Sequence, residues 1–238
     1  MVEIHKIKDI KTKNPTVIIG FPGTGLVGSV AASQIIDSLK LEFVGYITSE
    51  SFAPLAAIHD YVPLPAARIH YSEQYNLVVI LSEMSIPVAT SMELAQKIYE
   101  YMTSIKAKEA ITLGGICMHE GEDKIYAIST DLGKVKELEK KKIANSIKEG
   151  ATTGVAGTLL TMGTVLKFPV LSILAESSQD ELDPKAAANA ILALSKILNI
   201  KIDIKELQTE AKDMEKQMKN KMIKSKIISK KPTGSMYG

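Results

Sequence analysis

The chain has 238 residues, of which 45% are hydrophobic and 24% charged, a balance typical of a globular protein with one core, or one core and an appendage. This composition excludes a wholly disordered chain, and no apolar run approaches the roughly 20 residues that span a bilayer. Charges stand where a signal peptide has its apolar stretch, and the single cysteine, Cys117, has no partner for an internal disulfide. We therefore expect a cytoplasmic protein.

Charge is unevenly distributed along the sequence. The formal net charge is +2, but residues 219–238 carry six lysines and no acid, so residues 1–218 sum to −4. Arg68 is the only arginine, although guanidinium groups are the usual planar partners of phosphate. The sequence therefore argues against an enzyme that holds phosphates through several arginines.

The predicted elements alternate between strands and helices. Apolar, β-branched runs predict strands at residues 16–21, 41–48, 76–82, 109–116, 124–129 and 168–177. Helical periodicity predicts helices that begin near Leu26 and cover 91–105, 131–148 and 183–199, the last with Asp183 as N-cap and Pro184 at its first position. A Pro-rich crossing occupies 52–72, and glycine-rich segments at 20–28 and 154–163 are interpreted as two strand-to-helix turns. This alternation predicts an α/β fold of three layers, a mostly parallel sheet with helices on both faces.

Beyond residue 200 the pattern changes to a narrow apolar stripe on a charged helix. Its members recur three and four residues apart: Ile204, Leu207, Ala211, Met214 and Met218. Asp203 and Glu206 resemble a capping box. Such a stripe packs either on the protein's own body, which we favour, or on another subunit or partner. We divide the chain into an α/β domain at 1–200, an amphipathic helix at 201–222 and a flexible Lys-rich tail at 223–238.

The stretch GTGLVG at residues 23–28 has the spacing of a dinucleotide-binding loop. It follows a strand and opens a helix, and Glu50 comes where a ribose-binding acid is expected. However, Phe21 and Pro22 lengthen the turn, the Pro-rich crossing interrupts the alternation of strands and helices, and no hydride-acceptor pocket stands out. We therefore interpret the glycines as structural residues that let the helix pack closely on the sheet: Gly20, Gly23, Gly25 and Gly28.

No other pattern predicts catalysis, a metal site or a cofactor. His5, His59, His70 and His119 lack the spacing of zinc ligands, and no nucleophile motif or Walker loop occurs. Glu83 and Glu120 follow predicted strands at the edge where α/β active sites lie, which leaves a hydrolase or phosphorylase open.

Five segments, taken in order, resemble the proteasome-assembling chaperone 2 family in its archaeal branch: GFPGTGLVGSVAA, NLVVILSE, ITLGGI, TTGVAGTLL and DPKAAANAILAL. The resemblance runs from about residue 14 to residue 222. It implies a phosphorylase-like fold with no known catalytic role for the glycine turn, homo-oligomeric assembly, and ATP-independent binding to the α-subunits of the 20S proteasome.

The resemblance also implies a role for the last residues. Met236, Tyr237 and Gly238 match the hydrophobic-Tyr-any (HbYX) pattern by which such chaperones look to engage pockets between α-subunits. The terminal carboxylate would pair with a pocket lysine while Met236 and Tyr237 supply apolar surface. The tail lysines would steer this end toward an acidic ring: Lys224, Lys226, Lys230 and Lys231. Without interleaved aromatics they do not predict specific nucleic-acid binding.

We therefore expect a non-enzymatic chaperone or adaptor that forms a homo-oligomer and binds the 20S α-ring through its tail. The subunit number, a paralogous chain in the oligomer, and the choice between assembling and regulating the proteasome stay open. The alternative is an enzyme on a phosphorylase-like or Rossmann-like scaffold, with a nucleotide or nucleoside near Gly23, Gly25 and Gly28.

Overall fold

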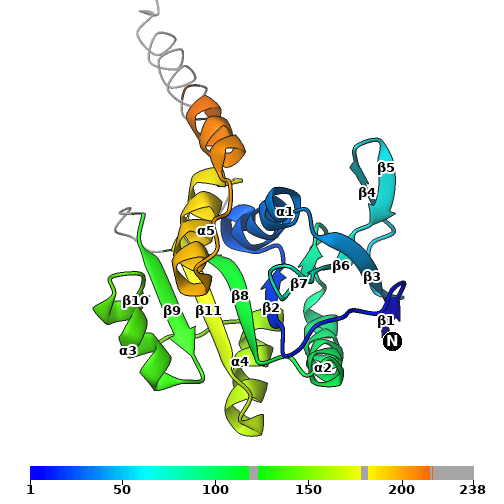
Figure 1. Ribbon diagram of the computed structural model, residues 1–238, viewed down its shortest axis with the longest axis horizontal. Coiled ribbons are helices and arrows are strands. Elements are labelled where there is room, and N and C mark those ends of the chain that lie inside the picture. The colour runs from blue at the N-terminus through cyan, green and yellow to red at the C-terminus, as the bar shows by residue number, and fades with distance from the viewer. Residues whose placement is uncertain (118–122, 178–181, 215, 217–238) are drawn as a thin grey trace, which may run out of the picture.

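The computed structural model describes residues 1–117, 123–177, 182–214 and 216. Within them a nine-stranded sheet has the order β1-β3-β6-β7-β2-β8-β11-β9-β10 (Figure 1). Its strands are β1 (Val2–Lys6), β2 (Thr16–Gly20), β3 (Glu42–Ser49), β6 (Ala67–Ser72), β7 (Leu77–Ser82), β8 (Glu109–Ile116), β9 (Ile125–Ser129), β10 (Asn145–Ser146) and β11 (Val170–Glu176). A separate hairpin pairs β4 (Ala56–His59) with β5 (Val62–Pro65).

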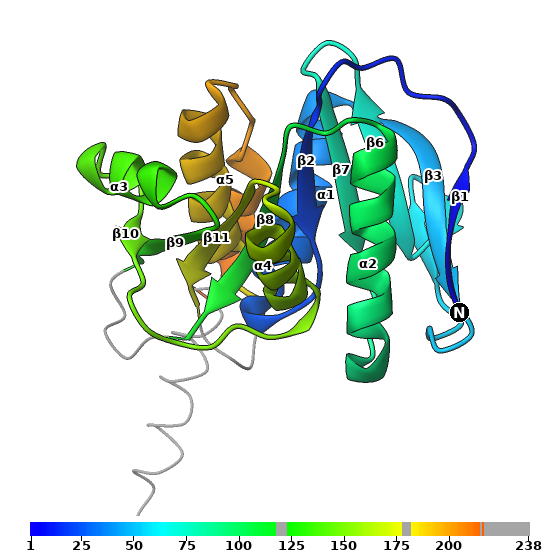
Figure 2. The ribbon, with the colours of Figure 1, turned by 90° about the horizontal axis from the view of Figure 1, so that it is seen from below.

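Helices cover both faces of the sheet. Figure 2 shows α2 (Val88–Ser104) and α4 (Gly154–Leu166) on one face, while α1 (Val27–Leu39) and α5 (Pro184–Leu198) pack together on the other. Alternate residues of the buried strand β2 supply the two cores: Ile18 faces α1 and α5, whereas Val17 and Ile19 face α2 and α4. The short helix α3 (Leu132–Lys140) lies beside β9 and β10. The three-layer prediction is therefore confirmed.

The prediction of a mostly parallel sheet is wrong. β7, β2, β8 and β11 form a parallel centre, but half of the eight pairings in the sheet are antiparallel. Two of these pairings involve β6, which lies with β4 and β5 in the segment interpreted as a Pro-rich crossing. Another comes from β1, whose charged residues hid its alternation. β6 is joined to β7 by a short turn and to β3 through the β4–β5 hairpin, with no helix in either connection, so both of its pairings can be antiparallel.

Two further boundaries differ from prediction. The segment 154–163 is not a turn but most of helix α4, in which a side chain at Gly163 would lie 2.6 Å from Val170 Cγ2, so the glycine serves helix packing. The helix predicted at 131–148 ends at Lys140, and Asn145 and Ser146 pair with β9 instead. The start of α5 is as predicted, because Asp183 Oδ1 accepts a hydrogen bond from the Ala186 N–H at 2.9 Å and Pro184 begins the helix.

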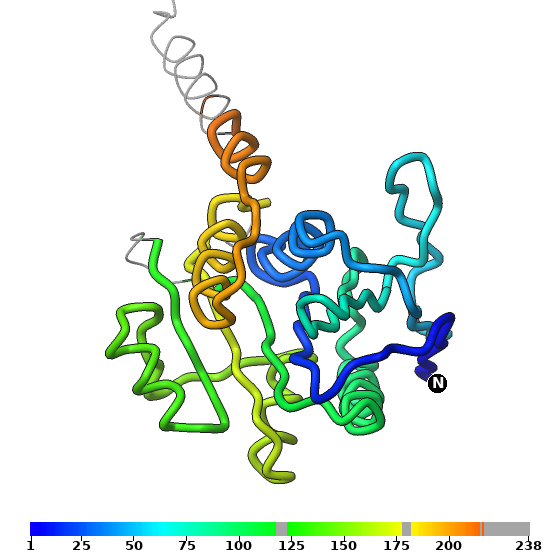
Figure 3. The backbone as a smooth tube through the Cα atoms, in the orientation of Figure 1, coloured from blue at the N-terminus to red at the C-terminus, as the bar shows by residue number. Residues whose placement is uncertain are grey.

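The chain after α5 forms another helix at 205–214. Asp203 caps the start of this helix, because its Oδ1 accepts a hydrogen bond from the Lys205 N–H at 3.0 Å. In a capping box the Asp203 N–H would donate to the Glu206 side chain, but here it donates to Ser38 Oγ at 2.7 Å. Figure 3 shows this helix and the β4–β5 hairpin leaving the body on the same side, with α1 between them. None of the helices in the described ranges is both long and apolar enough to cross a bilayer.

Candidate functional site

The chain's own atoms lie close against three of the four glycines in the glycine turn. A methyl group at Gly20 would lie 2.1 Å from the Gly28 carbonyl oxygen, and one at Gly28 would lie 2.5 Å from the carbonyl oxygens of Leu113 and Phe21. Gly25 has a positive φ of 62°, and a Cβ there would lie 2.0 Å from Ser177 Oγ. Around Gly23, by contrast, no atom of the described residues lies within 4 Å of an added Cβ. Close packing therefore accounts for Gly20, Gly25 and Gly28 without a ligand.

The position of Glu50 also differs from that of a ribose-binding acid. In a dinucleotide-binding unit the acid ends the strand next to the one that precedes the glycine turn. Here Glu50 follows β3, and β6 and β7 separate β3 from β2 in the sheet. The Glu50 side chain is 95% exposed and lies 3.9 Å from the N-terminal ammonium. The glycine turn and Glu50 therefore do not form one site.

Glu83 belongs to a cluster of charged and polar side chains, which we call the clamp, with the buried Arg68 and the partly exposed His59. Arg68 is only 3% exposed and donates to Glu83 Oε1 at 2.6 Å and to the Pro65 carbonyl at 3.0 Å. His59 Nε2 lies 2.7 Å from the same carboxylate oxygen. Burial alone would raise the pKa of Glu83, but the hydrogen bonds and charge of Arg68, helped by His59, hold it below its ordinary value. Thus the chain's only arginine and the glutamate considered for catalysis fix the base of the β4–β5 hairpin.

His70 is a buried, uncharged residue of β6. It is 6% exposed, and its Nδ1 lies 3.3 Å from the Leu41 carbonyl oxygen. Burial lowers the pKa of His70 to about 4. His70 is thus neutral at physiological pH and belongs to the core. Glu120 and His119, the other candidates, lie outside the described residues.

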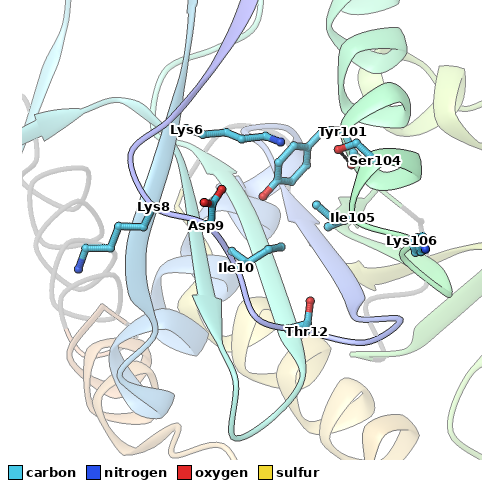
Figure 4. A pocket seen from close by; sticks show the side chains of 9 residues that line it. All are labelled: Lys6, Lys8, Asp9, Ile10, Thr12, Tyr101, Ser104, Ile105 and Lys106. Atoms are coloured by element: carbon cyan, nitrogen blue, oxygen red, sulfur yellow. Dashed lines mark hydrogen bonds between the residues drawn. The ribbon is translucent and has the colours of Figure 1, made fainter.

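A cavity of about 290 Å³ lies between the segment after β1 and the end of α2 (Figure 4). Lys6, Asp9 and Thr12 line it from one side, and Tyr101 and Ser104 from the other. Burial raises the pKa of Tyr101 to about 12, so its hydroxyl stays protonated. No residue in this lining pairs a nucleophile with a base, and in the described part of the chain no His, Cys, Asp and Glu side chains gather as a metal site. Neither the cavity lining nor the described His, Cys, Asp and Glu side chains therefore indicate a particular reaction.

The apolar stripe divides into a buried and an outer part. Ile204 and Leu207 are 8% and 3% exposed and belong to the core shared with α1 and α5. Ala211 and Met214, farther along the helix, are half-buried, and Met218 lies outside the described residues. The first two residues thus anchor the helix on its own body, and a subunit or partner contact of the stripe would involve the remaining ones.

The tail residues singled out in the sequence also lie outside the described residues: Lys224, Lys226, Lys230, Lys231, Met236, Tyr237 and Gly238. The structure does describe the helix at 205–214, which precedes these residues in the chain. Besides the two buried side chains, Gln34 Nε2 donates to the Asp203 carbonyl at 3.0 Å. The helix at 205–214 is therefore firmly attached where it leaves the body.

The sequence pattern missed the apolar surface of the hairpin. Tyr61 is 99% exposed, and Ile58, Val62 and Leu55 are 65%, 53% and 50% exposed. Proline residues and mixed small side chains suggested a connecting segment. The available signal was the run from Ala53 to Leu64, in which Asp60 is the only formal charge.

Comparison with known proteins identifies close similarities over almost the whole chain. The model of the PAC2 family matches residues 17–222. An uncharacterized protein of Methanocaldococcus jannaschii is 31% identical over 216 residues, which is 91% of this chain and 88% of that protein.

Solved structures agree with this match. The crystal structure of Pyrococcus furiosus PbaA, described as an archaeal homolog of proteasome-assembly chaperone, has a TM-score of 0.82 at 27% identity and covers 99% of both chains. Pyrococcus furiosus PbaB, described as an archaeal proteasome activator, has a TM-score of 0.80 at 28% identity, covering 92% of this chain and 98% of that one.

Proposed function

Because the chain belongs to the PAC2 family, we propose that it is an ATP-independent, non-catalytic chaperone or adaptor of the 20S proteasome that works as a homo-oligomer. The observation that carries the proposal is the match of nearly the full chain to PbaA and PbaB, both of which are described by a relation to the proteasome. The filled glycine turn and the engagement of Glu83 in the clamp are consistent with a protein that binds without catalysis.

In this proposal the last residues contact pockets between neighbouring α-subunits. Met236 and Tyr237 supply apolar and aromatic surface, and Gly238 supplies its carboxylate to a lysine. Three residues bind weakly because they must first be ordered. Several tails on one oligomer remedy this, since each engagement after the first is effectively intramolecular.

The attachment of the C-terminal helix supports this role. The buried side chains of Ile204 and Leu207 and the hydrogen bonds of Asp203 fix the helix to the body, so its far end has a defined direction. A flexible segment of 15 residues spans about 20 Å. The tail lysines would guide that segment toward an acidic surface, an effect that salt screens.

Deletion of residues 236–238 tests the proposal. We expect at least a tenfold loss of co-sedimentation with 20S particles and an unchanged oligomer mass. Tyr237→Ala should have a similar effect, whereas Met236→Leu, which preserves the hydrophobic-Tyr pattern, should bind as the unaltered chain does. Undiminished binding after the deletion would reject the tail as the contact. Parallel assays with free α-subunits and finished particles distinguish an assembly chaperone from a regulator.

A thermal-shift screen with NAD, ATP and nucleosides tests the enzyme alternative. A ligand that binds the native state raises its apparent stability. We expect no shift, because atoms of Gly28, Ser177 and Leu113 occupy the space at the glycine turn.

A further inference from the structure

The β4–β5 hairpin and the residues before it form an apolar projection, which we call the arm (residues 53–65). Among the described strands, β4 and β5 pair only with each other, and a two-residue turn at Asp60 and Tyr61, with φ of 47° and 66°, joins them. The arm holds one formal charge, at Asp60, in a chain of which 24% of residues are charged. A two-stranded hairpin is marginally stable in isolation, so the arm depends on contacts with something else.

The two faces of the arm differ in chemistry. The register pairs Ala57 with Leu64 and His59 with Val62 on one face, where Ala57 is buried and His59 joins the clamp. The opposite face pairs Ala56 with Pro65 and Ile58 with Pro63, so it carries only apolar side chains. Ile58 is 65% exposed on this face, and Tyr61 at the tip is 99% exposed. The body therefore covers the base of one face, where Ala57 is buried, and leaves the opposite, wholly apolar face open.

The arm's outer edge favours contact through side chains rather than strand addition. A two-residue turn makes His59 and Val62 a hydrogen-bonded pair of the ladder. The backbone nitrogens of Pro63 and Pro65 in β5 therefore face outward, away from β4. Proline has no N–H to donate, so this edge of β5 cannot accept another strand in a regular ladder.

The clamp holds the arm in one orientation. Arg68 Nη1 donates a hydrogen bond to the Pro65 carbonyl oxygen at the end of β5. The Nε2 atom of His59, in β4, lies 3.1 Å from Arg68 Nη2. Because the arm is fixed before it meets a partner, little conformational entropy is lost on binding. A rigid, uncharged apolar surface is typical of a permanent interface, which resembles a protein core.

We propose that the arm is a subunit contact that packs against a second copy of this chain. The proposal deepens the proposed function, since it rests on the homo-oligomer included there. Interfaces with transient partners are about as polar as the rest of a protein surface, whereas interfaces between identical subunits are more apolar. The low charge of the arm therefore favours an identical subunit as its partner. Tyr61 brings about 150–250 Å² to an interface that needs roughly 800 Å² per subunit, so the arm forms its centre and body residues complete it.

The same chain offers a receiving surface. Val88 and Met92 are 91% and 71% exposed and lie four residues apart, on one side of the first turns of α2. The arm leaves the body on the side of α1, while α2 covers the opposite face of the sheet (Figures 1 and 2). A chain cannot place its arm on its own α2, but it can reach that of a neighbour. The contact is therefore heterologous and repeats from subunit to subunit, which closes a ring when the rotation permits.

The test compares Ile58→Asp with Leu132→Asp, a matched control in which the side chain is 66% exposed at the start of α3. Mass is measured by light scattering over a range of concentrations, and far-UV circular dichroism verifies folding. We expect the unaltered chain and Leu132→Asp to share a mass that is a multiple of 25.8 kDa, and Ile58→Asp to dissociate at a concentration at least tenfold higher with an unchanged spectrum. Met92→Asp on the receiving surface should behave like Ile58→Asp.

A monomeric unaltered chain, or an Ile58→Asp variant that keeps the full mass, overturns the proposal. The mass measurement contains no proteasome, so its outcome is independent of the tail deletion. If Ile58→Asp keeps its mass but loses co-sedimentation with 20S particles, the arm contacts the particle and the subunit contact is rejected. If tail deletion leaves binding intact while Ile58→Asp lowers the mass, the subunit contact stands and the tail model fails.

Discussion

The glycine turn and the arm show opposite relations between sequence pattern and surface. The turn has the spacing of a ligand-binding loop, yet atoms of the chain itself fill the space beside Gly20, Gly25 and Gly28. The arm has the composition of a connecting segment, yet it presents Ile58 and Tyr61 to solvent. A recognisable motif therefore marks a packing constraint here, and an unremarkable segment carries the open apolar surface. Exposure, which depends on the tertiary fold, separates the two.

The clamp joins the arm to the body, and breaking it should have the largest effect. Glu83→Ala leaves the buried Arg68 without its charge partner, and we expect the free energy of unfolding to fall by about 3–5 kcal/mol. Urea denaturation measures the loss, and hydrogen exchange should accelerate across the arm. Glu100→Ala, which removes an exposed ion pair with Lys97, is the control and should leave exchange in the arm unchanged. A Glu83→Ala chain as stable as the original would mean that the clamp is not structural.

The glycine turn can be examined with two alanine substitutions. Gly20→Ala places a methyl group 2.1 Å from a backbone oxygen, so the backbone must move, at a cost of about 3 kcal/mol. Gly23→Ala meets no atom within 4 Å in the part of the chain that the structure describes, and Gly23 has an extended φ of −166°, so the substitution should change stability by less than about 0.5 kcal/mol. Chemical denaturation of both variants checks the difference. Equal stabilities would contradict the close-packing explanation.

The body next to the arm should also respond to acid through His70. In the unfolded chain the imidazole of His70 is protonated near its ordinary pKa of 6.5, whereas in the folded chain its pKa is about 4. Protonation therefore favours the unfolded state, and stability should fall as the pH drops from about 6.5 toward 4, by on the order of 2–3 kcal/mol. Denaturation curves across this range measure the slope. His70→Gln removes the titrating group, so its slope should be smaller; an identical slope would assign the acid sensitivity to other groups.

Local patterns predicted those parts of the fold in which one segment decides its own structure. The strands of the parallel centre are continuous apolar runs because both of their faces are buried, and α5 begins at Asp183 and Pro184 because a cap is a contact between neighbours in sequence. β1 and β6 were missed, since in the first Lys6 shares the face of Val2 and Ile4 and interrupts the apolar alternation, and the second follows prolines. The sheet's mixed direction was also missed, because strand direction depends on pairing between distant segments.

The sequence by itself determined that this chain alternates strands and helices, that its basic charge gathers at one end, and that its motifs match the PAC2 family. Only the tertiary structure decided that the glycine turn is filled, that Arg68 and Glu83 hold a hairpin, and that the stripe begins inside the core. The physical reason is that periodicity and capping act over a few residues. Burial and ion pairing instead bring together residues such as Gly25 and Ser177, which are far apart in sequence.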